Sequence, residues 1–417
     1  MNILFRLPIE LMGETLSHLS PDELTYKFDL EGLIYDTTFN SYSKVRQMAF
    51  FVKYKGKHVT ISNTNINDTH QLSNFQLQYL NITQMVIKPK VISFVLFDCN
   101  NRSSYNFISF MLSHHFKLLK SFTNKFSFQL SIHDDNLIDI NLLNGILYHF
   151  SYNNYIVNWF SIHYKTVKQI TGVQQTSFEE NSHDLNHGSI ENLKLHLFNS
   201  SRLMEHFMYF RNHNCLCGNL KTLDLSYNNI NDENLAKLYF PDSIQDLNLS
   251  NNNLHTISNN FNINNLANLR NLNLSNNNLI RISISINISF NLEVLVLSGN
   301  NLNNCNFLCK PFFQNLSKLN ISRNLISNLI NLPTSLERLD LSGNYLSSFF
   351  NEQTSNVFPA SLVELNLSWC KILFKARLNV IEAKRTLHIE NLHKLKSLIL
   401  SGNYYYNIDS EILQVCK

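Results

Sequence analysis

Hydrophobic residues recur at fixed offsets along the C-terminal half of the chain, between Leu220 and Tyr405. The first copy reads Leu220-x-x-Leu223-x-Leu225-x-x-Asn228-x-Ile230. Seven more copies begin at Ile244, Leu269, Leu292, Leu316, Leu336, Leu362 and Leu395. Successive copies start 24, 25, 23, 24, 20, 26 and 33 residues apart. A motif that returns at this interval predicts a solenoid, in which equivalent units stack because none can bury its apolar face alone.

Each copy contains a short stretch that alternates between apolar and polar residues, as a half-buried strand does. In the second copy we expect Leu247 and Leu249 to point inward and Asn248 to face the concave surface. The Asn that follows lies at a turn, where a buried side-chain amide can serve unpaired backbone donors and acceptors. That position holds Asn228, Asn252, Asn277, Asn300, Asn324, Asn344 and Asn403, and Cys370 in the seventh copy.

Four expectations follow for the repeat core. Leu272 and Leu274 should be almost fully buried, and Asn277 should support the turn. Its neighbour Asn276 should face solvent, so that Asn276→Ala should hardly matter. A further apolar residue, three positions after the motif, should add to the core; it is Ile257, Ile282, Leu329 or Phe349.

The eight copies resemble the leucine-rich repeat, whose consensus has this L-x-x-L-x-L-x-x-N/C-x-L spacing. The resemblance implies an α/β solenoid with a curved parallel sheet on the concave face and an irregular or short helical convex side. A small helical segment should precede it. We divide the chain into residues 1–52, a helical segment; 53–215, degenerate or irregular repeats; and 216–417, regular repeats with a C-terminal cap.

The first 52 residues show the pattern of short amphipathic helices. Proline suits the first helical position, so a helix should begin at Leu7-Pro8. The Ser20-Pro21-Asp22-Glu23 run predicts a second helix, with Ser20 as N-cap and Glu23 completing a capping box. A third helix is expected over residues 43–51. The inward residues should be Ile9, Met12, Leu16 and Leu19 in the first helix, Leu24 and Phe28 in the second, and Val45, Met48 and Phe51 in the third.

The run Leu7-Pro8-Ile9-Glu10-Leu11, with the second helix after it, resembles an F-box, although no tryptophan is present in the third helix. The resemblance implies docking on the Skp-type adaptor of a cullin-type ubiquitin ligase. The adaptor-binding residues that it implies are Leu7, Pro8, Glu10, Leu11 and Leu24. The alternative is a helical cap that seals the N-terminal end of the solenoid core.

Residues 53–215 carry weaker echoes of the repeat, mostly without the Asn. The echoes are Leu77/Leu80/Ile82, Val91/Phe94/Leu96, Leu130/Ile132, Phe160/Ile162 and Ile190/Leu193/Leu195. Longer, irregular repeats explain them, with segments such as 107–116 supplying convex helices; a separate globular domain is the alternative. Residues 183–189 are a candidate loop. The long seventh step predicts an exposed basic helix within 371–390, and Ile408, Ile412 and Leu413 a closing cap.

Composition narrows the function classes. A net charge of +3 is too small to imply nucleic acid. No apolar run reaches the roughly 18–20 residues of a membrane helix, and the N-terminal apolar patch is too short for a signal peptide. The seven cysteines are scattered without zinc spacing, which favours free thiols in a reducing compartment, cytoplasmic or nuclear.

Motifs for phosphate-binding loops and for the H-E-x-x-H zinc site are absent, and the chain has only ten glycines. His114-His115 and His133-Asp134-Asp135 are more typical of ordinary histidines than of a metal or acid–base site. We therefore expect a binding protein rather than an enzyme, with no catalytic residue, metal or cofactor.

The outward positions of the strands are the candidate partner-binding residues. A Ser column, from Ser226 to Ser401, does not vary between repeats and so cannot specify a partner. Other columns vary and include residue types that dominate protein interfaces. The candidates on the concave face are Tyr227, Asp246, Lys318, Arg323, Arg338, Glu364 and Trp369.

Two functions remain open at this point. The F-box resemblance implies a substrate receptor of a cullin-type ubiquitin ligase, with the adaptor on residues 1–52 and an unknown target protein on the solenoid. The alternative is a repeat scaffold or regulator that binds a partner directly through its concave face.

Overall fold

The computed structural model describes residues 15–28, 41–64, 68, 70–73, 76–77, 80, 86–97, 106–107, 110–123, 125–132, 156–164, 190–197, 203–204, 207–208, 219–258, 266–283, 292–330, 332–347, 350, 358–374, 385–387 and 389–405. Contacts divide the chain into two compact units. The N-terminal unit comprises residues 1–194 and 212–219, and the C-terminal unit comprises residues 195–211 and 220–417.

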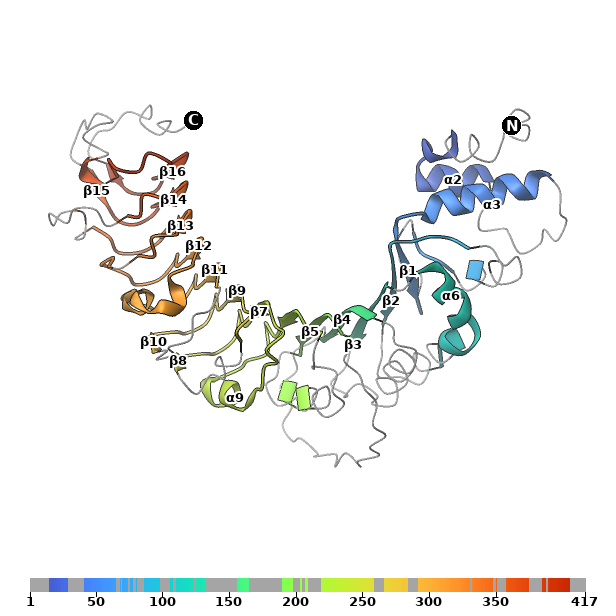
Figure 1. Ribbon diagram of the computed structural model, residues 1–417, viewed down its shortest axis with the longest axis horizontal. Coiled ribbons are helices and arrows are strands. Elements are labelled where there is room, and N and C mark those ends of the chain that lie inside the picture. Colours follow the sequence, from blue (N-terminus) through green and yellow to red (C-terminus); the bar gives the residue numbers. More distant parts are fainter. Residues whose placement is uncertain are drawn as a thin grey trace. The chain divides into compact units, whose positions relative to one another are not determined.

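Short parallel strands, one per repeat, are the main element of both units (Figure 1). The described residues include a sheet of thirteen strands whose order in space follows the chain, as a solenoid requires. The N-terminal unit holds β1 (His58–Ser62), β2 (Val91–Leu96), β3 (Lys125–Ile132) and β4 (Ile156–Tyr164), and β5 (Asn192–His196) spans the boundary. The C-terminal unit holds β6 (Thr222–Asp224), β7 (Asp246–Asn248), β9 (Asn271–Asn273), β11 (Val294–Val296), β12 (Lys318–Asn320), β13 (Arg338–Asp340), β14 (Glu364–Asn366) and β16 (Ser397–Ile399).

The strands of the C-terminal unit stack in register from β6 to β16. The central leucine of each strand pairs with the central leucine of the next, for example Leu247 with Leu272 and Leu272 with Leu295. Leu272 and Leu274 are 2% and 1% exposed, which confirms the expected inward positions. Ile257, Ile282 and Leu329 are also buried, as expected, whereas Phe349 lies outside the described residues.

The convex side of the C-terminal unit is irregular, as the resemblance implies. It carries helix α9 (Asp232–Lys237), the two-stranded pair β8 (Thr256–Ser258) and β10 (Arg281–Ser283), and the short 3₁₀ helices η5 (Asn306–Cys309) and η6 (Pro311–Phe313). Near its end, β15 (Leu373–Phe374) pairs with β17 (Tyr404–Tyr405). Elements this short add little area of their own, so the side chains beneath them supply most of the burial.

The N-terminal unit begins with the expected helices. Helix α2 (Pro21–Phe28) starts with the predicted capping box: the Ser20 N–H donates to Glu23 Oε2 at 2.9 Å, and the Glu23 N–H donates to Ser20 Oγ at 3.2 Å. Residues 15–17 are helical, with Leu16 buried and Leu19 half-buried. Residues 1–14, with Leu7, Pro8, Glu10 and Leu11, lie outside the described residues.

Helix α3 (Ser41–Tyr54) is longer than expected and is rotated relative to the prediction. Met48 and Phe51, predicted to face inward, are only half-buried, whereas Ala49, Phe50 and Tyr54 are fully buried. The Phe50 and Tyr54 rings lie 4.9 Å apart, and the Tyr54 hydroxyl donates to the Gln71 carbonyl. The helix therefore continues one turn further to anchor Tyr54, and this anchor sets its inward face.

One of the five echoes was assigned to the wrong element. Leu77 and Leu80 are helical, and Ser73 and Gln76 form a reciprocal capping pair before them. The spacing of three between Leu77 and Leu80 is therefore helical, and the strand that precedes β2 is β1, which begins 33 residues before β2. The other four echoes coincide with β2, β3, β4 and β5. Convex helices are present near 107–116, as π-helix η3 (Met111–His115) and α6 (Phe116–Phe122).

An aromatic stack fills the core of the N-terminal unit. Phe94, Phe128 and Phe160 occupy equivalent positions on β2, β3 and β4. All three are fully buried, and their ring centroids are 5.0 Å and 5.9 Å apart. Phenylalanine fills more volume than leucine, which suits the greater length of these repeats.

Several expectations fall outside the described residues: the 183–189 loop, residues 375–384 of the basic insertion, and the cap at Ile408, Ile412 and Leu413. The division at residues 52 and 215 also stays a prediction. Among the residues that the structure describes, no helix is both long and apolar enough to cross a membrane.

Candidate partner-binding face

A ladder of asparagines, all of them buried except the half-buried Asn252, joins seven of the eight repeats of the C-terminal unit to the repeat before. Asn277 Nδ2 donates to the Leu249 carbonyl of the preceding repeat and to the Leu274 carbonyl of its own, both at 3.0 Å. Its Oδ1 accepts from the Leu254 N–H at 3.1 Å. The same three contacts recur at Asn228, Asn252, Asn300, Asn324, Asn344 and Asn403.

Cys370 replaces asparagine once and only partly substitutes for it. Its Sγ donates to the Leu341 carbonyl at 3.2 Å, but a thiol is a weak donor and offers no amide oxygen. The Leu346 N–H, which an asparagine would satisfy, donates instead to the Cys370 carbonyl at 3.0 Å. Burial raises the pKa of the Cys370 thiol to about 11, so it stays protonated and inert.

Five of the eight serines in the column are buried, contrary to the sequence interpretation, whereas Ser298 and Ser342 are half-buried and Ser401 is exposed. Ser226, Ser250, Ser275, Ser322 and Ser368 are at most 8% exposed. In each of these repeats the serine N–H donates to the Asp or Asn oxygen two residues earlier. The column is therefore a turn that ends each strand, and its constancy has a structural cause.

The Tyr227 column has a backbone property that the sequence did not reveal. All eight of its residues have positive φ: Tyr227, Asn251, Asn276, Gly299, Arg323, Gly343, Trp369 and Gly402. Glycine and asparagine adopt this left-handed conformation at least cost, which explains why they dominate the column. Tyr227, Arg323 and Trp369 hold it against their steric preference, and all three are exposed.

Two hollows lie on the concave face, which is defined by the outward residues of β6 to β16. The larger, about 350 Å³, is the concave groove; Val294, Val296, Lys318, Arg338, Glu364 and Ile399 are among its lining residues. The smaller, about 170 Å³, lies over Thr222, Asp246 and Asn271. Within it the Asp246 carboxylate accepts hydrogen bonds from both Thr222 and Asn271, so this carboxylate is already occupied.

Three of the seven predicted partner-binding residues come together in the groove. Lys318 pairs in register with Arg338, and Arg338 with Glu364. Arg338 Nη2 lies 3.3 Å from Glu364 Oε1, in an ion pair about half exposed to solvent. Of the other four, Arg323 and Trp369 lie at the edge, and Tyr227 and Asp246 lie several repeats away. Leu24, which was predicted to bind the adaptor, is only 2% exposed within the N-terminal unit.

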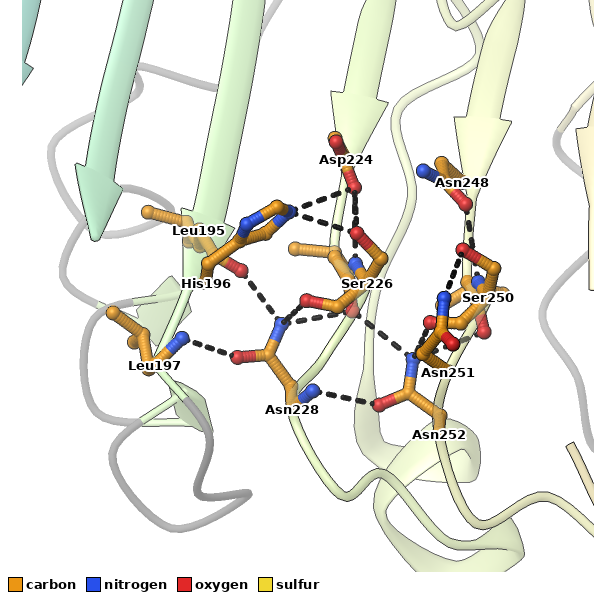
Figure 2. Close-up of polar contacts among 12 residues, drawn as sticks. Leu195, His196, Leu197, Asp224, Ser226, Asn228, Asn248, Ser250, Asn251 and Asn252 are labelled. Atoms are coloured by element: carbon orange, nitrogen blue, oxygen red, sulfur yellow. Dashed lines mark hydrogen bonds and ion pairs between the residues drawn. The ribbon is translucent and has the colours of Figure 1, made fainter. Parts of the chain in front are cut away.

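A buried polar cluster at the start of the C-terminal unit was missed by the sequence analysis (Figure 2). His196 Nε2 lies 2.7 Å from Ser226 Oγ and 3.4 Å from Asp224 Oδ1, and Ser226 Oγ donates to Asp224 at 2.6 Å. Burial raises the pKa of the Asp224 carboxyl, but hydrogen bonds from His196 and Ser226 outweigh it and hold the pKa well below its usual range. The available signal was a histidine at the serine position of the Ile190/Leu193/Leu195 echo.

This Ser–His–Asp set does not have the geometry of a catalytic triad. In a triad the Ser and Asp contact opposite nitrogens of the imidazole, whereas here both lie at Nε2. Because Ser226 donates its proton to Asp224, the Nε2–H donates to Ser226, and the ring cannot act as a base toward that hydroxyl. The cluster joins the repeat that contains β5, through His196, to the repeat that contains β6, through Asp224 and Ser226. The described residues contain no group of three or more His, Cys, Asp or Glu side chains that could hold a metal.

The family model described as Leucine Rich Repeat matches residues 219–238 and 335–356. Similar solved structures include an internalin from Listeria monocytogenes, which is 15% identical with a TM-score of 0.40. The match covers 95% of this chain and 93% of the internalin chain. A leucine-rich repeat protein from Leptospira interrogans is 18% identical with a TM-score of 0.41, and the match covers 82% of this chain and 83% of that protein's chain. No curated protein matches the sequence. The strand register and the asparagine ladder define a leucine-rich repeat fold, and the family model matches two segments within it.

The ladder generates a paired prediction. Asn277→Ala should cost at least about 2 kcal/mol of unfolding free energy, because the Leu254 N–H and the Leu249 carbonyl lose their buried partner at about 1–3 kcal/mol each. The left-handed backbone corrects the expectation that Asn276→Ala would hardly matter, since alanine at φ 52° costs about 1 kcal/mol. The matched control is therefore Asn276→Gly, which should change stability by less than about 0.5 kcal/mol. Equal shifts of the urea midpoint would show that the ladder is misassigned.

Asp224 gives a pH prediction. A carboxyl with a depressed folded pKa stabilises the fold above its unfolded pKa of about 3.9, and this contribution is lost as the pH falls through the folded pKa. Asp224→Asn should therefore be less stable than the parent at neutral pH, yet lose less stability between about pH 5 and about pH 2. Urea midpoints across this range measure the effect, with the exposed Asp242→Asn as control. Parallel profiles for parent and Asp224→Asn would contradict the assignment.

Proposed function

We propose that this leucine-rich repeat protein binds a protein partner in the concave groove of β11 to β16. The observation that supports the proposal is the change in residue type along the groove. Val294, Val296 and Ile399 stand where the other repeats carry polar or charged residues, and they flank Lys318 and Arg338. Apolar contact area beside a few fixed charges is what a specific protein interface requires.

The charged residues of the groove can be recruited at low cost. The Arg338–Glu364 ion pair is about half exposed, and exposed pairs contribute about 0–1 kcal/mol. Lys318, beside Arg338 in register, is exposed. A carboxylate from a partner can therefore bind across Lys318 and Arg338 while Glu364 receives a donor from the same partner.

Charge reversal in the groove tests this proposal. Lys318→Glu with Arg338→Glu should weaken the purified partner's affinity by at least about tenfold, because two attractive contacts become repulsive. The control, Arg281→Glu with Lys310→Glu, makes the same charge change at exposed convex positions and should leave affinity unchanged. Co-purification followed by mass spectrometry identifies the partner, and titration calorimetry measures the affinities. A partner that binds the groove variant as well as the parent overturns the proposal.

We further propose, from the F-box resemblance, that residues 1–52 dock on a Skp-type adaptor, which would make the chain a substrate receptor of a cullin-type ubiquitin ligase. The capped α2 and the adjacent α3 supply a helix pair at the place where the resemblance expects one. The anchoring of Tyr54 to Gln71 supports the alternative, a cap on the repeats. Leu24 is 2% exposed, so Leu7, Pro8, Glu10 and Leu11 would have to carry most of the adaptor contact.

One double variant separates these two roles. Leu7→Ala with Pro8→Ala should abolish recovery of the adaptor without lowering the melting temperature if these side chains form the docking patch. A cap predicts the reverse, a lower melting temperature with no adaptor recovered even by the parent, because an uncapped core is exposed to water. Pull-down and thermal melting on the same preparations give both readings.

A further inference from the structure

Six exposed residues lie at the turns of the last four repeats, and together we call them the edge ridge: Arg323, Leu325, Tyr345, Trp369, Lys371 and Tyr404. They occupy the positions immediately before and after the ladder asparagine or Cys370 of their repeats. The ladder side chain between them is buried, so both flanking side chains project from the same edge of the solenoid. This edge is distinct from the concave groove, which is lined by strand residues.

Two residues of the edge ridge, both at the position before the ladder residue, have a backbone conformation that is unfavourable for their residue type. Arg323 and Trp369 have φ of 52° and 58°, and Lys371, after Cys370, has φ of 57°. Only four described residues other than glycine and asparagine have positive φ, and these are three of them. Backbone strain of this kind costs on the order of 1–3 kcal/mol and concentrates at functional positions.

The glycines of the next repeats make room for the large side chains. A Cβ added at Gly402 would lie 2.3 Å from the Trp369 ring, and one added at Gly343 would lie 3.4 Å from the Arg323 side chain. The Trp369 ring thus packs closely over the Gly402 backbone, yet the residue remains 67% exposed. One face of the indole is supported by the chain and the rest is open to a ligand.

The position after the ladder residue changes character along the solenoid. It is asparagine in the first four repeats, Asn229, Asn253, Asn278 and Asn301, and then becomes Leu325, Tyr345, Lys371 and Tyr404. Leu325, Tyr345 and Tyr404 are 46%, 42% and 56% exposed, which a solvated turn does not require. Lys371 Nζ lies 4.0 Å from the centre of the Tyr345 ring, in a cation–π contact that holds both side chains in place.

The charge of the ridge identifies the kind of partner. Neither flanking position carries an Asp or Glu in any of the eight repeats, and the only charges there are Arg323 and Lys371. Aromatic side chains and arginine dominate interface energetics, aromatic surfaces dock extended proline-containing segments, and cations recognise acidic ones. Two cations can neutralise few phosphates, whereas phosphate contacts supply most of the non-specific affinity of a protein for nucleic acid. A protruding row is also not the enclosed pocket that small molecules occupy.

We infer that the edge ridge is a second binding surface, separate from the proposed groove, for an acidic, extended protein segment that carries aromatic or proline side chains. Arg323 and Lys371 bind its carboxylates, and Trp369, Tyr345 and Tyr404 contact its apolar side chains. The surface stands on its own residues, so it does not depend on the partner proposed for the groove.

The left-handed positions allow a test in which loss of binding cannot be attributed to unfolding. Arg323→Gly, Trp369→Gly and Lys371→Gly, combined in one full-length chain, remove the ridge side chains and relieve the backbone strain. The melting temperature should be unchanged or higher. The affinity for a fluorescein-labelled random copolymer of glutamate and tyrosine, measured by anisotropy, should fall at least about tenfold. The matched control is Tyr227→Gly, an exposed aromatic at the same left-handed position in the first repeat, which should bind like the parent.

Three further probes decide the chemistry. A copolymer of lysine and tyrosine should bind at least about tenfold more weakly than the glutamate copolymer. Single-stranded polyuridylate should not compete. The Lys318→Glu and Arg338→Glu groove variant should retain most of the copolymer affinity. The inference is overturned if the parent fails to bind the glutamate copolymer, if the glycine variant binds it equally well, or if polyuridylate binds more tightly. Loss of binding in the groove variant alone would assign the acidic site to the groove and overturn the ridge.

Discussion

Buried asparagine amides are the constraint on which the C-terminal unit depends. Each amide contacts a carbonyl of its own repeat, a carbonyl of the preceding repeat and an N–H of the preceding repeat, as Asn277 does with Leu274, Leu249 and Leu254. These backbone groups lie beyond the three-residue strands, where no sheet partner could serve them. Because unpaired buried groups are costly, the amide fixes both the turn and the distance between neighbouring repeats. The leucine core is then brought into register by the turns as well as by its own packing.

The turn that the ladder fixes also determines where side chains can project. It places the preceding residue in the left-handed region in every repeat, so most repeats have glycine or asparagine there and present little to a partner. Arg323 and Trp369 depart from that rule and project large side chains from the edge. The concave groove differs, because its residues lie on ordinary strands and can vary without conformational cost. The two surfaces therefore differ in how freely their residues can be substituted. Residues of the groove can change without conformational cost, whereas a large side chain at the edge must be held in a left-handed backbone conformation.

The fold of the C-terminal unit could be predicted closely from the sequence, because each position of the repeat is filled by one residue type with one structural role. Leu272 and Leu274 were placed inside, and the register from β6 to β16 followed from the spacing. Positive φ at Arg323 and Trp369 could not be predicted, because those residue types disfavour it. His196 was missed because its repeat lacks the ladder asparagine, and the inward face of α3 was misplaced because it depends on the contact between Tyr54 and Gln71, distant in sequence. The partner-binding residues were chosen from their columns, and only Lys318, Arg338 and Glu364 share one groove.

Because Cys370 stands where the other repeats have the ladder asparagine, the C-terminal end of the solenoid should open more easily than the rest. Stacked repeats open and close as a one-dimensional chain of coupled segments, and an opening that starts at an end spreads until it meets a strongly coupled junction. Between the sixth and seventh repeats a thiol and a carbonyl replace the amide, so this is the weakest joint of the series. We therefore expect the last two repeats, which carry Trp369, Lys371 and Tyr404, to fray as one segment, while the repeats that carry Arg323, Leu325 and Tyr345 stay closed. A ligand that spans both groups would suppress that fraying and rigidify the end of the solenoid as it binds.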